Sequence, residues 1–269
     1  MVVFPGCKIN LGLNVTGRRP DGYHDLETCF YPVGWCDALE AIPSDSFSLE
    51  VTGAELSGGP DNICHKAWKL LNWRFGAPPV KAWLHKAIPH GAGLGGGSSD
   101  GAAMLVMLNR MFSLGLDTTA LESVALELGS DCPFFISGKP TLAAGKGEVF
   151  SSVNLSLAGM TIAVIKPAGS IPTGEAYRHV TIGPPLHPIK SILETMPVEE
   201  WRGNLTNAFE PYAFHMIPEL PGIISKLYEA GAAYASMSGS GSAVFGLFRK
   251  PIDIQEIAAG RTCWTGLLA

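Results

Sequence analysis

The first residues of the chain alternate between apolar and polar side chains, as in a β-strand with two different faces. In residues 7–15 the apolar side chains occupy the odd positions, and the even positions hold Lys8, Asn10, Gly12 and Asn14. The alternation predicts a strand that carries Lys8 and Asn10 on one polar face.

Similar patterns predict the other elements. Alternating or continuous apolar runs predict strands in residues 27–43, 46–53, 80–88 and 160–167. Strand pairs joined by glycine-containing turns are predicted in residues 140–153 and 233–248. Apolar residues at helical spacing predict helices in residues 62–76, 98–115, 118–129, 189–196 and 218–232. A surface loop with a short helix is predicted in residues 168–188, and a short helix with a last strand in residues 253–269.

The order of these elements indicates the fold class. Helices and strands follow one another irregularly, which favours an α+β fold over a regular β-α alternation. The character of the sequence changes near Ser152, so we predict two lobes, residues 1–151 and residues 152–269.

Composition narrows the class of protein. The chain has 269 residues, of which 46% are hydrophobic and 16% charged, enough apolar material for a sizeable core. A net charge of −5 without a Lys/Arg run argues against a nucleic-acid partner. No apolar run is long enough to span a membrane, and the N-terminus lacks the features of a secretory signal. The six cysteines form no C-x-x-C pair, which favours a cytoplasmic protein with reduced thiols.

The densest motif is the glycine-rich segment PHGAGLGGGSSDGAA, residues 89–103, which follows a predicted strand and opens an apolar helix. Glycines let the backbone approach a ligand closely, and a helix N-terminus attracts anions, so the segment predicts a phosphate site. Ser98 and Ser99 could cap the helix, bind phosphate or orient a metal. The motif lacks the Gly-Lys-Ser/Thr ending of a P-loop and the strand with a terminal acidic residue that a dinucleotide-binding fold needs about 20 residues on. A flexible surface loop or a tight packing turn is the alternative.

Two charged residues are candidates for chemistry. Lys8 could stabilise a phosphate or lower the pKa of a hydroxyl, and the alternative is a solvated strand face. Asp131, in GSDCPFF, is either a helix N-cap or a general base beside Lys8.

Other segments suggest contacts with a ligand. Residues 237–246, MSGSGSAVFG, lie between apolar stretches, which favours a tight loop between buried strands over a linker. Such a loop could press on a ligand or on the first glycine segment. Tyr23 and His24 follow a turn and could clamp a planar ring, as could Tyr177, and the alternative is ordinary aromatic packing with an exposed histidine.

Three motifs in this order resemble those of the GHMP kinases, the superfamily of galactokinase and of homoserine, mevalonate and phosphomevalonate kinases. They are KIN (8–10), GAGLGGGSSD (91–100) and SGSGSAVFG (238–246). Residues 8–28 and the GSDCPFF and SGSGS segments are most similar to the 4-diphosphocytidyl-2-C-methyl-D-erythritol kinase branch. That branch commonly has Pro-Ala before the lysine, where this chain has Gly6 and Cys7. The resemblance implies a two-lobed fold with the active site in the cleft between an N-terminal ATP-binding lobe and a C-terminal lobe.

The resemblance also implies the chemistry. ATP, with Mg²⁺ bridging its phosphates, would phosphorylate the C2 hydroxyl of 4-diphosphocytidyl-2-C-methyl-D-erythritol, in the non-mevalonate pathway to isoprenoids. Lys8 and Asp131 would be the catalytic pair. No residue is assigned as a metal ligand, and the role of Lys146 is left open. A monomer or homodimer without nucleic-acid or membrane partners is expected.

The resemblance assigns the binding residues as well. The ATP phosphates would lie against Pro89, His90, Gly91, Ala92, Gly93, Leu94, Gly95, Gly96, Gly97, Ser98 and Ser99. Asn62 and Lys86 match positions near the nucleotide base. The substrate would contact Asn10, Tyr23, His24, Thr173, Tyr177, Gly239 and Ser240.

Alternative functions remain open on these grounds. Another kinase of the superfamily, acting on mevalonate or homoserine, would share the three motifs, although Tyr23 and His24 favour a cytidine compound. A nucleotide-binding homologue without activity is a further alternative, and the presence of both Lys8 and Asp131 argues against it. A purely structural module would leave the density of glycines unexplained.

Overall fold

A computed structural model describes residues 1–185 and 187–269, which form two compact units. Unit 1 consists of Met1–Cys7, Trp35–His90 and Gly95–Lys139. Unit 2 consists of Lys8–Gly34, Gly91–Leu94 and Pro140–Ala269. The glycine segment is therefore divided, with Gly91–Leu94 in unit 2 and the residues on either side of them in unit 1.

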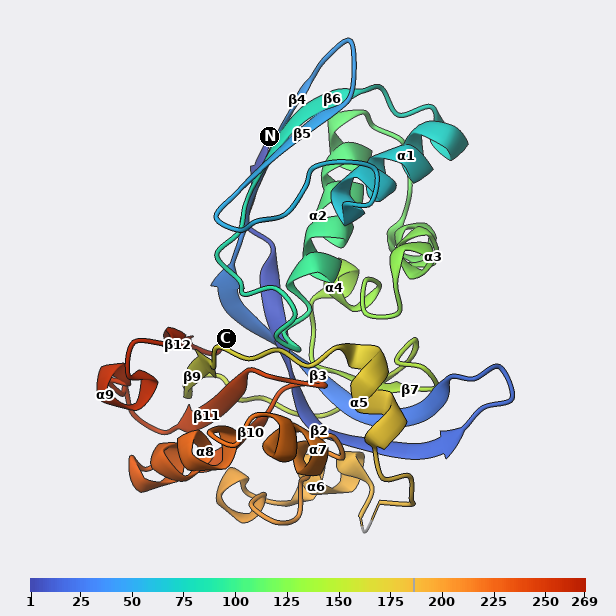
Figure 1. The fold of residues 1–269 in the computed structure, drawn as a ribbon. Coiled ribbons are helices and arrows are strands. Elements are labelled where there is room, and N and C mark those ends of the chain that lie inside the picture. Colours follow the sequence, from blue (N-terminus) through green and yellow to red (C-terminus); the bar gives the residue numbers. More distant parts are fainter. Residues whose placement is uncertain (186) are drawn as a thin grey trace. The chain divides into compact units, whose positions relative to one another are not determined.

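Unit 1 combines a four-stranded sheet with helices (Figure 1). The sheet has the order β1-β4-β6-β5, formed by β1 (Val2–Val3), β4 (Ala38–Pro43), β6 (Val80–His85) and β5 (Ser48–Thr52). β4 runs antiparallel to β6, and β5 runs parallel to it. The helices are α1 (Ile63–Phe75), α2 (Gly96–Met111), α3 (Thr118–Leu128) and α4 (Phe134–Ser137). Buried side chains of β4 and β6 pack with those of α1, α2 and α3 into one core.

Local chemistry explains where these helices begin and end. Asn62 caps α1 by accepting a bond from the backbone N–H of Cys64 (3.0 Å), and Gly76 ends it in a left-handed conformation (φ 68°). Both ends match the prediction. α2 begins earlier than predicted, because Gly95 is its N-cap, and no side chain caps it. The predicted capping role of Ser98 and Ser99 is therefore wrong.

Unit 2 contains two further four-stranded sheets. One has the order β2-β3-β7-β8, formed by β2 (Gly6–Arg18), β3 (His24–Cys36), β7 (Thr141–Ala144) and β8 (Val149–Ser152). The other is antiparallel, in the order β10-β11-β9-β12, formed by β10 (Tyr234–Met237), β11 (Val244–Phe248), β9 (Thr161–Lys166) and β12 (Thr262–Leu267). The helices are α5 (Thr173–His179), α6 (Ile189–Thr195), the 3₁₀ helix η1 (Val198–Glu200), α7 (Glu210–Met216), α8 (Leu220–Glu229) and α9 (Gln255–Ala258).

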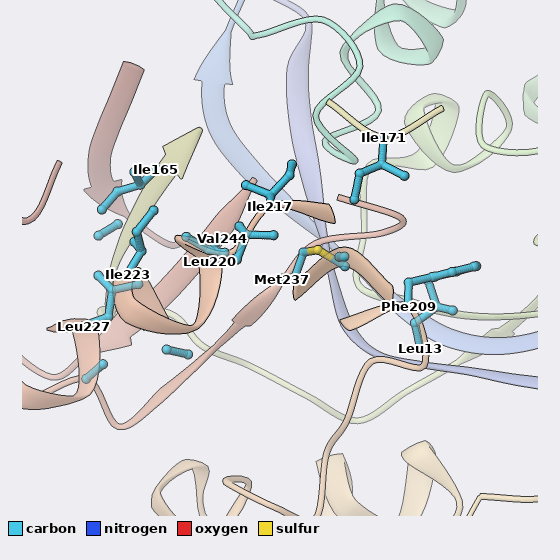
Figure 2. Close-up of a cluster of buried hydrophobic side chains, with 14 of the residues drawn as sticks. Leu13, Ile165, Ile171, Phe209, Ile217, Leu220, Ile223, Leu227, Met237 and Val244 are labelled. Carbon is cyan, nitrogen blue, oxygen red and sulfur yellow. The ribbon is translucent and has the colours of Figure 1, made fainter. Parts of the chain in front are cut away.

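The core of unit 2 draws on segments that are far apart in the sequence (Figure 2). Leu220, Ile223 and Leu227 form the buried stripe of α8, at the helical spacing that the sequence showed. They join Ile165 of β9 and Val244 of β11 in one buried cluster. Burying side chains of this size stabilises the unit by roughly 1.5–3 kcal/mol each.

Strand pairing explains why the units do not follow the chain order. β3 pairs with β7, with Thr28 opposite Ala143 and Phe30 opposite Thr141. This pairing holds β2 and β3 in one unit with the second half of the chain, although they precede the whole of α1 and α2. The predicted division at residue 151 is sequential, so it differs from these discontinuous units, and the assignment of the two lobes stays a prediction.

None of the helices in the described part of the chain has the length and apolar character needed to cross a membrane.

Candidate active site

The polar face of β2 is buried. Lys8 and Asn10 are 4% and 3% exposed, so the solvated strand face considered for Lys8 is wrong. The Lys8 Nζ donates to Asn10 Oδ1 (2.6 Å) and to the carbonyl oxygen of Gly93 (3.1 Å). It also lies 5.0 Å from the ring centroid of Phe30. The strand therefore fixes a buried ammonium group against the glycine segment.

Asn10 continues this network away from Lys8. Its Nδ2 donates to Thr28 Oγ1 (2.9 Å), and that hydroxyl donates to the Gly12 carbonyl oxygen (2.5 Å). Because a lysine can only donate, Asn10 Oδ1 must face Lys8 and its amide nitrogen must face Thr28. Thr28, which is 1% exposed, thus sets the orientation of Asn10. Thr28 was not among the predicted site residues, since a threonine within a strand carries no signal of its own.

The tip of the glycine segment, Gly91–Leu94, turns its carbonyl groups toward β2 and toward the loop between β10 and β11. The carbonyl of Leu94 accepts from the backbone N–H of Lys8 (2.9 Å), and that of Ala92 from the N–H of Ala243 (3.1 Å). Gly93 accepts from Ser238 Oγ (2.9 Å) as well as from Lys8.

The backbone N–H groups of the same segment are available to bind a ligand. Within the described residues, the backbone N–H groups of Gly91 to Gly95 have no hydrogen-bond partner. Gly91, Gly93 and Gly95 have left-handed φ angles of 63°, 75° and 70°, so the chain turns at every second residue. Successive donors in such turns form an anion-binding concavity. This geometry supports the predicted phosphate site and argues against a loose loop.

The two glycine-rich segments pack backbone against backbone. A Cβ on Gly93 would lie 2.0 Å from the Ser238 carbonyl oxygen, and a Cβ on Gly239 would lie 3.0 Å from the Gly93 oxygen. Ser238 Oγ also accepts from the N–H of Asn10 (3.2 Å). The predicted tight loop between buried strands is confirmed, since β10 and β11 flank it and both are buried.

Asn207 holds this second loop from the other side. Its Nδ2 donates to the carbonyl oxygens of Met237 (2.9 Å) and Gly239 (2.8 Å), and its side chain is buried. Glu210 accepts from Ser236 Oγ (2.8 Å) and from the N–H of Met237 (2.9 Å), and burial raises the pKa of this carboxyl. Neither Asn207 nor Glu210 was among the predicted site residues. Their Asn-x-x-Glu spacing before a helix, similar to a capping box, was the available signal.

Two of the remaining substrate candidates in unit 2, Thr173 and Tyr177, lie on α5, and each contacts another candidate. Thr173 Oγ1 lies 3.4 Å from Ser240 Oγ, and Tyr177 stacks on His24 with ring centroids 5.1 Å apart. Thr173 and Tyr177 are four residues apart, so they share one helix face. Tyr23 is 60% exposed, and Lys146 Nζ lies 4.7 Å from its ring centroid. The structure thus joins His24 to Tyr177 but places the Tyr23 ring against Lys146.

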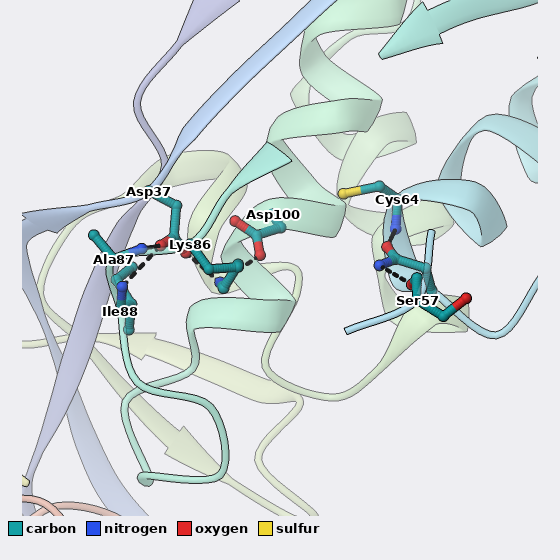
Figure 3. A network of polar contacts seen from close by, with 8 residues as sticks. Asp37, Ser57, Cys64, Lys86, Ala87, Ile88 and Asp100 are labelled. Carbon is teal, nitrogen blue, oxygen red and sulfur yellow. Dashed lines mark hydrogen bonds and ion pairs between the residues drawn. The ribbon is translucent and has the colours of Figure 1, made fainter. Parts of the chain in front are cut away.

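Unit 1 contains the other candidates, Pro89, His90, Asn62, Lys86, Asp131 and the first turn of α2. The uncapped start of α2, Gly96 to Ser98, presents backbone N–H groups and the positive end of the helix dipole. Asn62 uses both ends of its amide within the protein, since its Nδ2 donates to the Ser57 carbonyl oxygen (2.9 Å). Lys86 is 5% exposed and lies between two carboxylates (Figure 3).

Asp131 does not cap a helix. The N-cap of α4 is Pro133, without a side-chain bond, and Asp131 Oδ1 accepts from Ser130 Oγ at 3.5 Å. The N-cap alternative is therefore wrong. Because Asp131 belongs to unit 1 and Lys8 to unit 2, their pairing stays a prediction.

Comparison with known proteins decides the family. Residues 62–139 match the GHMP kinases N terminal domain, and residues 191–261 match the GHMP kinases C terminal domain. The chain is 49% identical over 253 residues to 4-diphosphocytidyl-2-C-methyl-D-erythritol kinase of Bacteroides fragilis, with 92% of each chain covered. The chain belongs to the 4-diphosphocytidyl-2-C-methyl-D-erythritol kinase family.

Solved structures agree with this family. The crystal structure of a 4-(cytidine 5'-diphospho)-2C-methyl-D-erythritol kinase matches with a TM-score of 0.84 at 36% identity, covering 100% of this chain and 99% of the other. Homoserine kinase from Cytophaga hutchinsonii matches with a TM-score of 0.67 at 16% identity, covering 98% of this chain and 95% of the other, and shows the shared fold alone. The α+β GHMP kinase fold is confirmed. As a member of this kinase family, the chain is an ATP-dependent small-molecule kinase.

Proposed function

We propose that the chain transfers the γ-phosphoryl group of ATP to the C2 hydroxyl of 4-diphosphocytidyl-2-C-methyl-D-erythritol, a step of non-mevalonate isoprenoid biosynthesis. The observation that carries the proposal is the contact of Lys8 Nζ with Asn10 Oδ1 and the Gly93 carbonyl oxygen. It fixes a cation at the tip of a loop whose own sequence lacks the P-loop lysine. The 49% identical relative, a 4-diphosphocytidyl-2-C-methyl-D-erythritol kinase, supports the choice of substrate.

The phosphate site follows from the backbone. The donors of Gly91 to Gly95 and the uncapped start of α2 would bind the phosphates of ATP, and the dipole of α2 would favour their negative charge. Lys8 would hold the transferring phosphoryl group and the attacking oxygen. Phosphoryl transfer depends mainly on positioning and charge neutralisation, which these groups supply.

Mg²⁺ fits this arrangement as part of the nucleotide. The described residues contain no group of three or more His, Cys, Asp or Glu side chains placed to hold a metal ion. Mg²⁺ commonly keeps several waters and binds substrate phosphates, so it needs no such group. When bound, it would neutralise charge on the β- and γ-phosphates.

The acceptor hydroxyl loses its proton during the transfer, so the site needs a group that accepts the proton or orients the hydroxyl. We assign Asp131 to this role, as a base or as the group that orients the hydroxyl, and Gly239 and Ser240 to closing the site around the acceptor. A general base contributes about 10²–10⁴-fold to such a reaction.

The cytosine ring would be held by Tyr23, His24 and Tyr177, with Thr173 nearby. A base between two rings needs them about 7 Å apart, twice the van der Waals contact distance. The His24 and Tyr177 centroids are 5.1 Å apart, so the base stacks on an outer face of this pair or displaces His24.

The test is an ADP-release assay with the cytidine substrate, mevalonate and homoserine, on wild type and Asp131→Asn. Turnover of the cytidine compound alone, slowed about 10²–10⁴-fold in the variant, is expected. Turnover of mevalonate or homoserine instead would overturn the substrate. An undiminished rate in Asp131→Asn would overturn its role as a base.

We also assign the protein to the cytoplasm. Cys29 and Cys132 are buried thiols, and burial raises the pKa of each to about 12, which keeps them protonated and inert. Fractionation of cells would test the location, and size-exclusion chromatography would distinguish monomer from homodimer.

A further inference from the structure

Three buried charged residues in unit 1 connect the two ends of the glycine segment (Figure 3). Lys86 directly follows β6, and its Nζ donates to Asp37 Oδ2 and to Asp100 Oδ2, the latter at 2.7 Å. The side chains of Asp37, Lys86 and Asp100 are 0%, 3% and 2% exposed. Asp37 lies between β3 and β4, and Asp100 lies in the second turn of α2.

Asp37 fixes the entry to the segment. Its Oδ1 accepts from the backbone N–H groups of Ala87 (2.6 Å) and Ile88 (2.8 Å), the residues immediately before Pro89. Its own N–H donates to the Pro5 carbonyl oxygen (2.9 Å). One carboxylate therefore holds the backbone of the entry and the side chain of Lys86 together.

Asp100 fixes the other end of the glycine segment, where the chain enters α2. It stands on α2, whose first turn packs directly on the entry residues. A Cβ added to Gly96 would lie 2.9 Å from Ile88 Cγ2 and 3.4 Å from Lys86 Nζ. The start of α2 thus has no freedom to move toward the entry, and the ion pair with Lys86 prevents it from moving away.

From these contacts we propose that Asp37, Lys86 and Asp100 form a clamp that sets the distance between the two ends of the glycine segment. Asp37 and Asp100 are then positioning residues for ATP, acting through the backbone donors of residues 89–98. The proposal rests on the assignment of this segment to ATP binding. Both carboxylates bind the Lys86 ammonium group, so this side chain links the residues before Pro89 to α2.

The composition of the clamp argues for a positional role. Burying two carboxylates with one ammonium group costs desolvation energy that three apolar side chains would not. The arrangement also leaves Asp100 Oδ1 buried without a hydrogen-bond partner within the described residues. Burial raises the pKa of Asp100 to about 7 despite the opposing effect of Lys86. Directional ionic contacts define a distance between their partners more sharply than apolar packing does.

The test compares variants that break the clamp with one that keeps it. In Asp37→Asn an amide donor can face the Lys86 ammonium group, and Asp100→Ala removes an acceptor. Asp100→Asn keeps an acceptor for Lys86, because its amide nitrogen can take the position of the unpartnered oxygen. Leu71→Ala, a fully buried site on α1 outside the clamp, is the control for lost stability.

The readouts are the Kd of a non-hydrolysable ATP analogue by calorimetry, the KM of both substrates, kcat and the melting temperature. Asp37→Asn and Asp100→Ala should raise the Kd for the analogue about 10- to 100-fold, with the KM of the cytidine compound nearly unchanged. Asp100→Asn should bind the analogue with a Kd close to that of wild type. Leu71→Ala should lower the melting temperature without changing the Kd.

Two results would overturn the clamp: a Kd unchanged in folded Asp37→Asn and Asp100→Ala, or a Kd raised equally by Leu71→Ala. If Asp37→Asn fails to fold, Asp100→Ala and Asp100→Asn decide the outcome as a pair. Binding of the analogue requires no turnover, so the Kd values test the clamp independently of the substrate. A wild type that binds the analogue but leaves the cytidine compound unphosphorylated would contradict the proposed function and not the clamp.

Discussion

Gly93 and Ser238 approach so closely that no side chain fits between them: a Cβ on Gly93 would lie 2.0 Å from the Ser238 carbonyl oxygen. The two residues are joined by a hydrogen bond from Ser238 Oγ to the Gly93 oxygen, which Lys8 Nζ shares. The contact brings the two glycine-rich motifs together and places Lys8 where they meet.

Gly93→Ala should therefore damage both folding and ATP binding. The new Cβ meets backbone rather than a mobile side chain, and φ is +75°, so unfolding free energy should fall by about 2 kcal/mol or more. Gly91→Ala is the matched control, with φ +63° and open space around its Cβ, and should cost about 1 kcal/mol. Thermal unfolding and the KM for ATP measure the difference. Equal losses in the two variants would contradict the importance of this contact.

Thr28→Val should lower kcat although Thr28 is not assigned to any substrate. The change keeps the shape but leaves Asn10 Nδ2 and the Gly12 carbonyl oxygen without their partner, at a cost of about 1–3 kcal/mol. Asn10 then loses the bond that orients its oxygen toward Lys8. Thr28→Ser retains the hydroxyl and should stay near wild type. Steady-state kinetics of the two variants test this, and a Thr28→Val enzyme as fast as Thr28→Ser would refute it.

Asn207→Asp should displace the loop that carries Gly239. The amide donates to two carbonyl oxygens, whereas a carboxylate would repel both, so we expect a loss of about 3 kcal/mol and a lower kcat. Asn204→Asp is the control, since that partly exposed amide donates to the Glu200 carbonyl oxygen alone among the described residues, and the change should alter stability by less than about 0.5 kcal/mol. Denaturant unfolding and activity assays measure both variants. Similar values for them would show that the loop does not depend on Asn207.

Asp100 should make stability depend on pH in a defined direction. Burial raises its pKa from 3.8 to about 7, with Lys86 opposing and Asp37 adding to the shift. The folded chain thus holds this proton more tightly than the unfolded chain does. The stability from this group is complete below about pH 4 and is lost as the pH rises to about 7.

Asp100→Asn does not titrate, so its stability relative to wild type should increase between pH 4 and pH 7 by on the order of a few kcal/mol. Lys86, whose pKa is lowered by burial but raised overall by Asp100 and Asp37, stays charged across this range. The nearby Cys64 stays neutral, since burial raises the pKa of its thiol. Denaturant unfolding at several pH values measures the difference. A constant difference, or one of opposite sign, would contradict the raised pKa.

The sequence by itself determined the local features of this protein. Period-two alternation identified β2, and helical spacing with a stop at Gly76 identified α1. The three glycine and lysine motifs, in order, indicated the family that the comparisons confirm. The short α4 and α7 were missed, because each buries a single side chain, Phe134 or Ala213, and so has no apolar stripe.

Only the tertiary structure decided which residues act together. β3 pairs with β7, far later in the chain, and Gly93 accepts from both Lys8 and Ser238. Lys8, Gly93 and Ser238 therefore share one unit, whereas Asp131 belongs to the other. The polar face of β2, which alternation alone could have left in solvent, became a buried network because other strands and loops cover it. Asp37 and Thr28 have no motif, since their roles depend on hydrogen bonds to groups elsewhere in the chain, the backbone N–H of Ile88 and the side chain of Asn10. Alternation and spacing act along a few residues, whereas burial and hydrogen-bond partners are set by segments that meet only in the folded chain.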